Sequence, residues 1–293
     1  MNYRTMLFMP GNNPGMLQSS DILGADAIII DLEDAVSLPE KDAARELVKE
    51  YLKTFKSEEK EGSDIYVRVN PLDTDYFYKD LDALKDLNFD GIMLAKAFQE
   101  SVEALSKYLD DNNQKYDIFC LIETSQGVED ARNILAKSKR VKGVLLGAED
   151  LTLDLGAKRT KESDEIKYSR MRIVSCAKSL GLQAIDTPWT DTDDIEGLVM
   201  DTKKAKAMGM TGKALISPRH VDHVNEIFSP SKEDIDHAIR VMEALKDAKE
   251  KGLGAFSLDG KMVDRPIILR AINVLKMLGK YKEEYDELLQ WWY

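Results

Sequence analysis

The sequence is poor in the residues that build disulfide frameworks and nitrogen- or sulfur-bound metal sites. Its 293 residues include only two cysteines, Cys120 and Cys176, and three histidines. Two cysteines in so long a chain, both inside apolar segments, predict buried, reduced thiols of a cytoplasmic protein. No apolar run reaches the 18 residues of a membrane-spanning helix, and the N-terminus lacks the apolar stretch of a secretory signal. We therefore expect a cytoplasmic protein without a membrane span.

Positive charge is also scarce. Acidic residues number 53 against 41 lysines and arginines, which gives a formal net charge of −12. Such a field repels nucleic acids and anionic membranes, so we expect neither as a partner. It also repels an acidic substrate. Any such substrate must therefore be held by a local device, such as an arginine, a metal ion or a set of backbone N–H groups.

What the sequence does contain is an alternation of short apolar runs with longer helical patterns. The eight runs are continuous and β-rich, as expected of strands buried on both faces; they cover residues 5–10, 27–32, 64–69, 91–95, 117–122, 141–146, 183–187 and 213–217. Helical patterns lie between them, at 40–55, 80–87, 99–109, 127–136, 165–180 and 192–208. Eight such units predict a parallel (β/α)₈ TIM barrel.

An open, doubly wound sheet is the alternative architecture. Its phosphate loop would have to be the segment from Gly11 to Gly15, which lacks the third glycine of the dinucleotide fingerprint. After the eighth run, two helical segments at 232–251 and 266–292 flank a glycine-rich stretch at 252–260. We therefore expect a barrel domain over 1–228 and a C-terminal helical extension over 229–293, packed on the barrel or on a neighbouring subunit.

Active sites of such barrels form at the C-terminal ends of the strands. Acidic residues end four of the eight predicted strands, and these residues are Asp31, Glu33 and Asp34 after the second, Glu123 after the fifth, Glu149 and Asp150 after the sixth, and Asp186 at the seventh. Converging carboxylates repel one another unless a positive group lies among them. Oxygen ligands with few histidines suit Mg²⁺ or Mn²⁺, and Glu123 and Asp150 are the candidate ligands. The alternative is that such acids cap the following helices.

Arg68 ends the third predicted strand, where an unpaired arginine would be costly to bury. Its planar fork is suited to a substrate carboxylate or a developing enolate oxygen, and a surface salt bridge is the alternative. Gly147 and Ala148 follow the sixth strand, where their backbone N–H groups could approach a ligand as an anion nest.

Several motifs, in this order, resemble those of citrate lyase beta subunits over nearly the whole chain. They are Arg4 to Pro14, Asp31-Leu32-Glu33-Asp34-Ala35-Val36, Arg68-Val69-Asn70-Pro71, Ile122-Glu123-Thr124, Gly147-Ala148-Glu149-Asp150-Leu151, Ala184 to Pro188, Gly212 to Ile216 and Asp259 to Asp264. The wider group, the HpcH/HpaI aldolase-like proteins, includes malyl-CoA and citramalyl-CoA lyases.

The resemblance implies a Mg²⁺-dependent barrel, usually a homotrimer when it acts alone. It assigns the metal to Glu123 and Asp150, and the substrate and thioester enolate to Arg68. It implies that Glu33 and Asp34 hold metal-bound waters, and that Asp264 of an adjacent subunit acts as acid or base. The substrate-binding set expected from all of this is Arg68, Glu123, Gly147, Ala148 and Glu149. From sequence alone, capping of the last helix is an equal alternative for Asp264.

The implied reaction is cleavage of a citryl thioester on an acyl carrier protein to oxaloacetate and an acetyl thioester. Residues 5–40 contain no lysine or arginine, so the first loop lacks a basic contact for the phosphates of free CoA. This favours a carrier-protein substrate, within a citrate lyase complex. A stand-alone malyl-CoA or citramalyl-CoA lyase, and a non-catalytic barrel that serves as a scaffold, remain as alternatives.

Overall fold

The chain divides into two compact units, Met1–Phe228 and Ser229–Tyr293, in a computed structural model that describes residues 2–55, 62–253 and 256–292. Residues 254 and 255 of the glycine-rich stretch lie outside the described part. Within the described ranges, none of the helices combines the length and the apolar character that crossing a bilayer requires.

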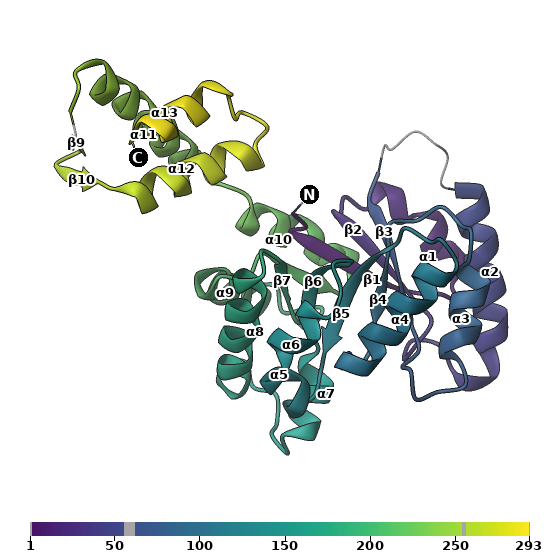
Figure 1. The fold of residues 1–293 in the computed structure, drawn as a ribbon. Coiled ribbons are helices and arrows are strands. Elements are labelled where there is room, and N and C mark those ends of the chain that lie inside the picture. Colours follow the sequence, from purple (N-terminus) through teal and green to yellow (C-terminus); the bar gives the residue numbers. More distant parts are fainter. Residues whose placement is uncertain (1, 56–61, 254–255, 293) are drawn as a thin grey trace. The chain divides into compact units, whose positions relative to one another are not determined.

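The first unit is a closed barrel of eight parallel strands in sequence order (Figure 1). The strands are β1 (Thr5–Pro10), β2 (Ala27–Asp31), β3 (Asp64–Val69), β4 (Gly91–Leu94), β5 (Asp117–Ile122), β6 (Val141–Leu146), β7 (Gln183–Asp186) and β8 (Gly212–Leu215). The barrel is closed by parallel pairing of β1 with β8, in which Met6 lies opposite Ala214. The predicted parallel (β/α)₈ fold is confirmed, with strand ends displaced by no more than two residues.

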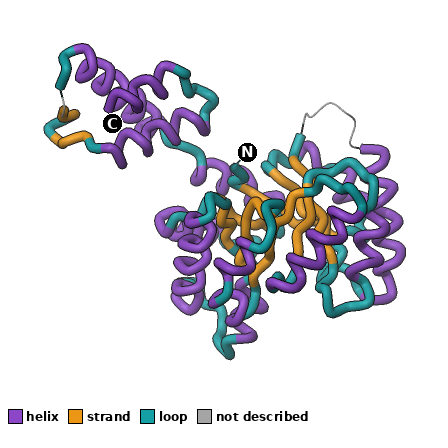
Figure 2. Tube along the Cα trace, viewed as in Figure 1, coloured by secondary structure: helices purple, strands orange, loops and turns teal. Residues whose placement is uncertain are grey.

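Helices surround the barrel on its outer side (Figure 2). They are α1 (Pro14–Gln18), α2 (Lys41–Phe55), α3 (Phe77–Leu84), α4 (Gln99–Asp111), α5 (Ser125–Glu129), α6 (Ala131–Ala136), α7 (Ala148–Asp154), α8 (Lys167–Ser179), α9 (Ile195–Met208) and α10 (Val221–Phe228). Short 3₁₀ turns are η1 (Ser20–Ile22), η2 (Leu38–Glu40), η3 (Asp164–Ile166) and η4 (Pro218–His220). The helix expected over 127–136 is broken into two at Asp130, which serves as the C-cap of α5 and the N-cap of α6.

The barrel has two apolar layers, because alternate side chains of each strand point to opposite faces. One layer lies between strands and helices, and the other fills the barrel interior. In the interior, the rings of Tyr66 and Phe119 meet edge to face with centroids 5.2 Å apart. Gly143 makes room for Phe119, since a Cβ at this glycine would lie 2.2 Å from a ring carbon. The barrel is therefore a packed core and not a pore.

The second unit consists of α11 (Lys232–Glu250), a hairpin of β9 (Phe256–Leu258) and β10 (Lys261–Val263), and the helices α12 (Arg265–Met277) and α13 (Glu284–Trp292). It has its own apolar core. The hairpin was not expected from sequence; its turn residues Asp259 and Gly260 both adopt positive φ, as tight hairpin turns require. The single helix expected over 266–292 is wrong, because the chain leaves the helical conformation at Gly279, where φ is 62°.

Candidate active site

The alternation of side chains along the strands brings one set of residues to the mouth of the barrel. Ile29, Tyr66, Leu121, Leu145 and Ile185 all face the barrel interior. The residues two positions further along must face the same way, above the interior layer. They are Asp31, Arg68, Glu123, Gly147 and Thr187.

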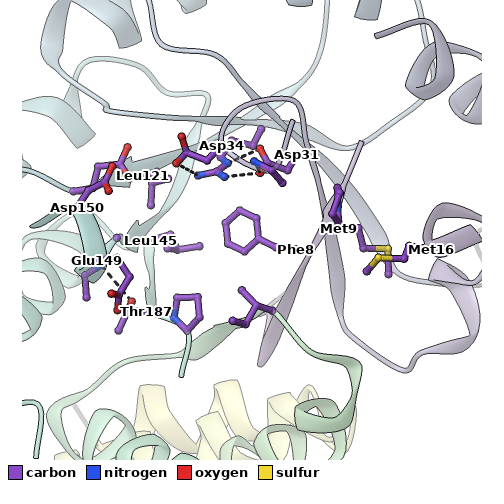
Figure 3. Close-up of a pocket in the computed structure, with 18 residues that line it drawn as sticks. Phe8, Met9, Met16, Asp31, Asp34, Leu121, Leu145, Glu149, Asp150 and Thr187 are labelled. Carbon is purple, nitrogen blue, oxygen red and sulfur yellow. Dashed lines mark hydrogen bonds and ion pairs between the residues drawn. The ribbon is translucent and has the colours of Figure 1, made fainter. Parts of the chain in front are cut away.

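These five residues share one open pocket with a volume of about 620 Å³. Its walls also include apolar and acidic side chains, among them Phe8, Met9, Met16, Asp34, Glu149, Asp150 and Ile216. Figure 3 draws Phe8 in the middle of the view, with Asp31, Asp34 and Asp150 along one edge of the pocket. Arg68 is the only lysine or arginine among the described residues that line it.

Arg68 is held rigidly. Its Nε and Nη2 donate to the two oxygens of Asp31 at 2.7 and 2.5 Å, and its Nη1 lies 2.8 Å from Glu33 Oε2 and 3.7 Å from Asp34 Oδ2. The ring centroid of Phe8 lies 5.0 Å from the guanidinium carbon. Burial disfavours the charge, but hydrogen bonding to Asp31 and the nearby acids outweigh it and raise the pKa of Arg68. The arginine is therefore a fixed cation with acids on one side.

Glu33 and Asp34 differ in their surroundings. Glu33 is buried, whereas the Asp34 side chain is 65% exposed. Burial raises the pKa of Glu33 to about 7; Arg68 opposes this increase, while Asp34 and Asp31 add to it. Glu33 Oε2 approaches Arg68 as an ion pair but is not aligned for a hydrogen bond, and within the described residues it has no hydrogen-bond partner. This oxygen could accept a proton from a bound water or a ligand.

Glu123 lines the same pocket. Its Oε1 accepts the backbone N–H of Lys96 at 2.8 Å, and its side chain is buried. Burial raises the pKa of Glu123 to about 8, and the negative charges of Glu33 and Asp150 contribute to the increase. Gly147 leaves room for this carboxylate, since a Cβ there would lie 2.7 Å from Glu123 Cβ. Asp150 approaches from the first turn of α7.

The residues present fit a hard divalent cation. Two carboxylates, Glu123 and Asp150, line the same pocket; burial raises the pKa of Glu123, and the charges of Glu33 and Asp150 add to the increase, so a bound cation would favour its ionised form. Mg²⁺ prefers such oxygen ligands and usually keeps several waters, so two protein ligands are enough. Among the described residues, no group of three or more acidic, histidine or cysteine side chains is arranged to hold a metal ion.

The anion nest suggested at Gly147 and Ala148 is not formed by these two N–H groups. Gly147 N donates to Ile122 O at 2.9 Å, and Ala148 N donates to Thr187 Oγ1 at 3.2 Å. Both residues still line the pocket, as does Glu149. The Glu149 carboxylate is exposed and accepts from Arg159 Nε at 3.0 Å.

The expectation that Asp186 joins the acids at the mouth is wrong. Asp186 follows Ile185 by one residue, so it faces the helices, where it accepts from Arg170 and from Lys213 Nζ. Asp201 on α9 accepts from the same two cations and completes a buried cluster of two positive and two negative groups. Thr187 takes the place at the mouth instead.

Asp264 belongs to the second unit. It is exposed and caps α12, with Oδ1 accepting from Ile267 N at 3.2 Å. The capping alternative considered from sequence is thus present. A cap does not exclude a further role, and the catalytic function of Asp264 across a subunit interface stays a prediction.

The fold and this pocket define a class of protein: an α/β-barrel enzyme with an acidic, arginine-bearing site at the C-terminal mouth of the barrel. Comparison with known proteins narrows the class. The chain belongs to the HpcH/HpaI aldolase/citrate lyase family, whose model matches residues 4–218. This membership and the relatives below identify it as a carbon–carbon lyase, as the motifs predicted.

The citrate lyase subunit beta of Leuconostoc mesenteroides subsp. cremoris is 39% identical over 94% of this chain and 92% of its own length. The mitochondrial citramalyl-CoA lyase of Homo sapiens is 30% identical over 96% of this chain and 87% of its own. Among solved structures, protein CitE from Mycobacterium tuberculosis in complex with magnesium, acetoacetate and coenzyme A is 29% identical. That match has a TM-score of 0.78 and covers 95% of this chain and 98% of CitE.

Proposed function

We propose that the chain is a Mg²⁺-dependent lyase that cleaves a citryl thioester, carried on an acyl carrier protein, to oxaloacetate and an acetyl thioester. The observation that carries the proposal is the pocket itself. It combines a fixed arginine, Arg68, with the buried Glu123 and with Asp150 at the mouth of the barrel. Similarity to citrate lyase beta subunits supports the citryl group.

The chemistry requires a proton and an electron pair to move. A base removes the hydroxyl proton of the citryl group, the adjacent C–C bond breaks, and oxaloacetate leaves. The bonding electrons become the enolate of the acetyl thioester, which then takes a proton on carbon. When bound by Glu123 and Asp150, Mg²⁺ would polarise the hydroxyl oxygen and orient the neighbouring carboxylate.

The remaining roles fall to side chains of the pocket and of the second unit. Arg68 offsets the charge on the enolate oxygen, a contact that strengthens as the charge develops. With Mg²⁺ bound, Glu33 and Asp34 would accept hydrogen bonds from its waters. Gly147, Ala148 and Glu149 border the substrate, and Asp264 of a neighbouring subunit moves the proton.

The proposal extends to the cellular setting. The lyase would act in the cytoplasm, as a homotrimer or within a citrate lyase complex, and Mn²⁺ could replace Mg²⁺ because it accepts the same oxygen ligands. Both cysteines, Cys120 and Cys176, are buried free thiols, which agrees with a reducing compartment.

The second candidate is a stand-alone lyase of CoA esters, such as malyl-CoA or citramalyl-CoA. Similarity to human citramalyl-CoA lyase favours it, as does similarity to CitE, whose structure contains coenzyme A. The absence of lysine and arginine from residues 5–40 argues against it, because the loop after the first strand then offers no basic side chain to the phosphates of CoA. A non-catalytic scaffold is disfavoured because Arg68, Glu123 and Asp150 are all present in the pocket.

An activity panel run in the direction of condensation tests these candidates. Acetyl-CoA and the acetylated carrier protein are each combined with oxaloacetate, glyoxylate and pyruvate in the presence of Mg²⁺, and products are measured by mass spectrometry. We expect citryl carrier protein from the carrier and oxaloacetate, and loss of this product in Glu123→Gln. Preferential formation of malyl-CoA or citramalyl-CoA would support the second candidate. No product from any combination would refute both.

A further inference from the structure

The segment that follows β2 is fastened by side chains on both its N–H and its C=O groups. The carboxylate of Asp31 accepts the N–H groups of Glu33 and Ala35 at 2.8 and 2.9 Å. From the other side, Lys41 Nζ donates to Leu32 O at 2.7 Å and to Glu33 O at 2.6 Å. This is the segment that carries Glu33 and Asp34 into the candidate active site.

The placement of Lys41 is unusual for a lysine. It is the first residue of α2 and is only 5% exposed. Its ammonium group contacts two backbone carbonyls and lies 5.9 Å from the ring centroid of Tyr76. Lysines are almost never buried unless paired, because the ammonium loses its hydration. A helix of this kind could present a lysine to solvent at no such cost, so the buried position points to a task.

That task is not direct contact with a substrate. Lys41 is absent from the residues that line the pocket. Its carbonyl partners belong to Leu32 and Glu33. Asp31, which accepts the N–H groups of Glu33 and Ala35, also accepts from Nε and Nη2 of Arg68. Asp31 thus links the Arg68 guanidinium, which comes from β3, to the backbone segment that carries Glu33 and Asp34.

We propose that Lys41 is a positioning residue for the lyase site, one that works together with Asp31 as a clamp on residues 32–35. The clamp fixes the carboxylates of Glu33 and Asp34 relative to Arg68. The expected effect on catalysis rests on the proposed function, whereas the effect of Lys41 on the stability of the backbone at residues 32–35 does not. A displacement of about 1 Å in a catalytic group can cost roughly 100-fold in rate, so a clamp of this kind has a measurable effect.

The test is Lys41→Met, which keeps the length of the side chain and removes its donors. The matched control is Lys53→Met on the same helix, where the exposed ammonium pairs only with Glu50 at 2.7 Å among the described residues. We expect kcat of Lys41→Met to fall about 10- to 100-fold. We expect KM to stay within about twofold, because the clamp does not bind the ground-state substrate. The control should behave as the wild type.

Hydrogen exchange of individual amides gives a readout that does not depend on activity. In Lys41→Met, the amides of Glu33 and Ala35 should exchange at least about tenfold faster, while that of Ile29 in β2 stays protected. Unchanged exchange at residues 33 and 35, or unchanged kcat, would overturn the proposal. Equal loss of protection at Ile29 would also overturn it, since it would show a general structural role.

Two further arms keep the test decisive. If Lys41→Met does not fold, Lys41→Gln replaces it; glutamine keeps a neutral N–H donor on a shorter side chain, and the expected changes have the same direction and smaller size. If the wild type shows no lyase activity with any thioester, the proposed function fails, and the exchange data alone decide whether the clamp exists.

Discussion

We expect binding of Mg²⁺ to Glu123 and Asp150 to release a proton at neutral pH. Burial, together with the charges of Glu33 and Asp150, raises the pKa of Glu123 to about 8 in the metal-free protein. A carboxyl group must be ionised to bind a metal ion, so the two equilibria are coupled. Metal binding and pH therefore report directly on whether Glu123 is a ligand.

The size of the effect follows from the pKa values. A group with a pKa of about 8 is roughly 90% protonated at pH 7, so Glu123 should release about 0.9 proton when Mg²⁺ binds. Glu33, whose pKa is about 7, can add up to about half a proton. Below about pH 8, the apparent affinity for Mg²⁺ should increase roughly tenfold for each unit by which the pH is raised.

Isothermal titration calorimetry in two buffers of different ionisation enthalpy measures the number of protons released. We expect about one proton for the wild type and less than half of that for Glu123→Gln, together with weaker binding. An equal release in wild type and Glu123→Gln, or affinity that does not change with pH, would refute the assignment of Glu123 as a ligand.

The same shift has a consequence for stability. Between pH 4.5 and about 8 the folded, metal-free protein keeps a proton on Glu123 that the unfolded chain has lost. The free energy of unfolding of the metal-free protein should therefore decrease as the pH rises through this range. Since Mg²⁺ stabilises the ionised form, the rise in Tm on adding Mg²⁺ should be larger at pH 8 than at pH 6. A rise in Tm that is the same at both pH values would contradict this reasoning.

Three single substitutions and one mixing experiment test other parts of the molecule. Arg68→Lys should lower kcat/KM by about 100-fold, because one ammonium cannot replace a planar fork; steady-state kinetics close to wild type would exclude Arg68 from the mechanism. Gly147→Ala should weaken Mg²⁺ binding and destabilise the fold by about 1–3 kcal/mol, since its Cβ would press on Glu123, and calorimetry with thermal melts would measure both effects. Lys213→Met should cost about 3–5 kcal/mol in urea unfolding, because it leaves two buried carboxylates with one cation fewer. Mixing inactive Arg68→Ala and Asp264→Ala subunits should restore some activity if Asp264 completes a neighbour's site, whereas verified mixed oligomers without activity would leave only the helix cap.

Sequence patterns were sufficient for the barrel but not for the details of the second unit. The eight apolar runs are distinct because strands buried on both faces have continuous apolar sequences. The hairpin of Phe256–Leu258 and Lys261–Val263 has strands of three residues each, too short to produce a visible period. The break at Gly279 was missed because apolar residues continue on both sides of it, in α12 and α13.

The expectation that active-site residues follow the C-terminal ends of the strands identified the acids near the pocket. It could not tell whether a side chain at a strand end points into the barrel mouth or towards the helices. It grouped Asp186 with Glu123, although Asp186 faces the helices and binds Arg170 and Lys213. Side chains alternate along a strand, and Ile185 faces the barrel interior, so Thr187, two residues further on, faces the mouth in place of Asp186. The contact of Phe8 with Arg68 had no comparable signal, because nothing in an apolar strand marks which ring will meet a cation.

By itself, the sequence determined the parallel barrel, the ends of its strands and the family, since each depends on local periodicity or on contiguous motifs. Only the tertiary structure decided which strand-end groups share a pocket, and with what charge. Glu123 owes its raised pKa to burial and to Glu33 and Asp150, which come from different parts of the chain. Lys41 likewise becomes a clamp only because α2 packs against the segment after β2. Burial and Coulomb interactions depend on distance in space, and closure of the barrel sets those distances.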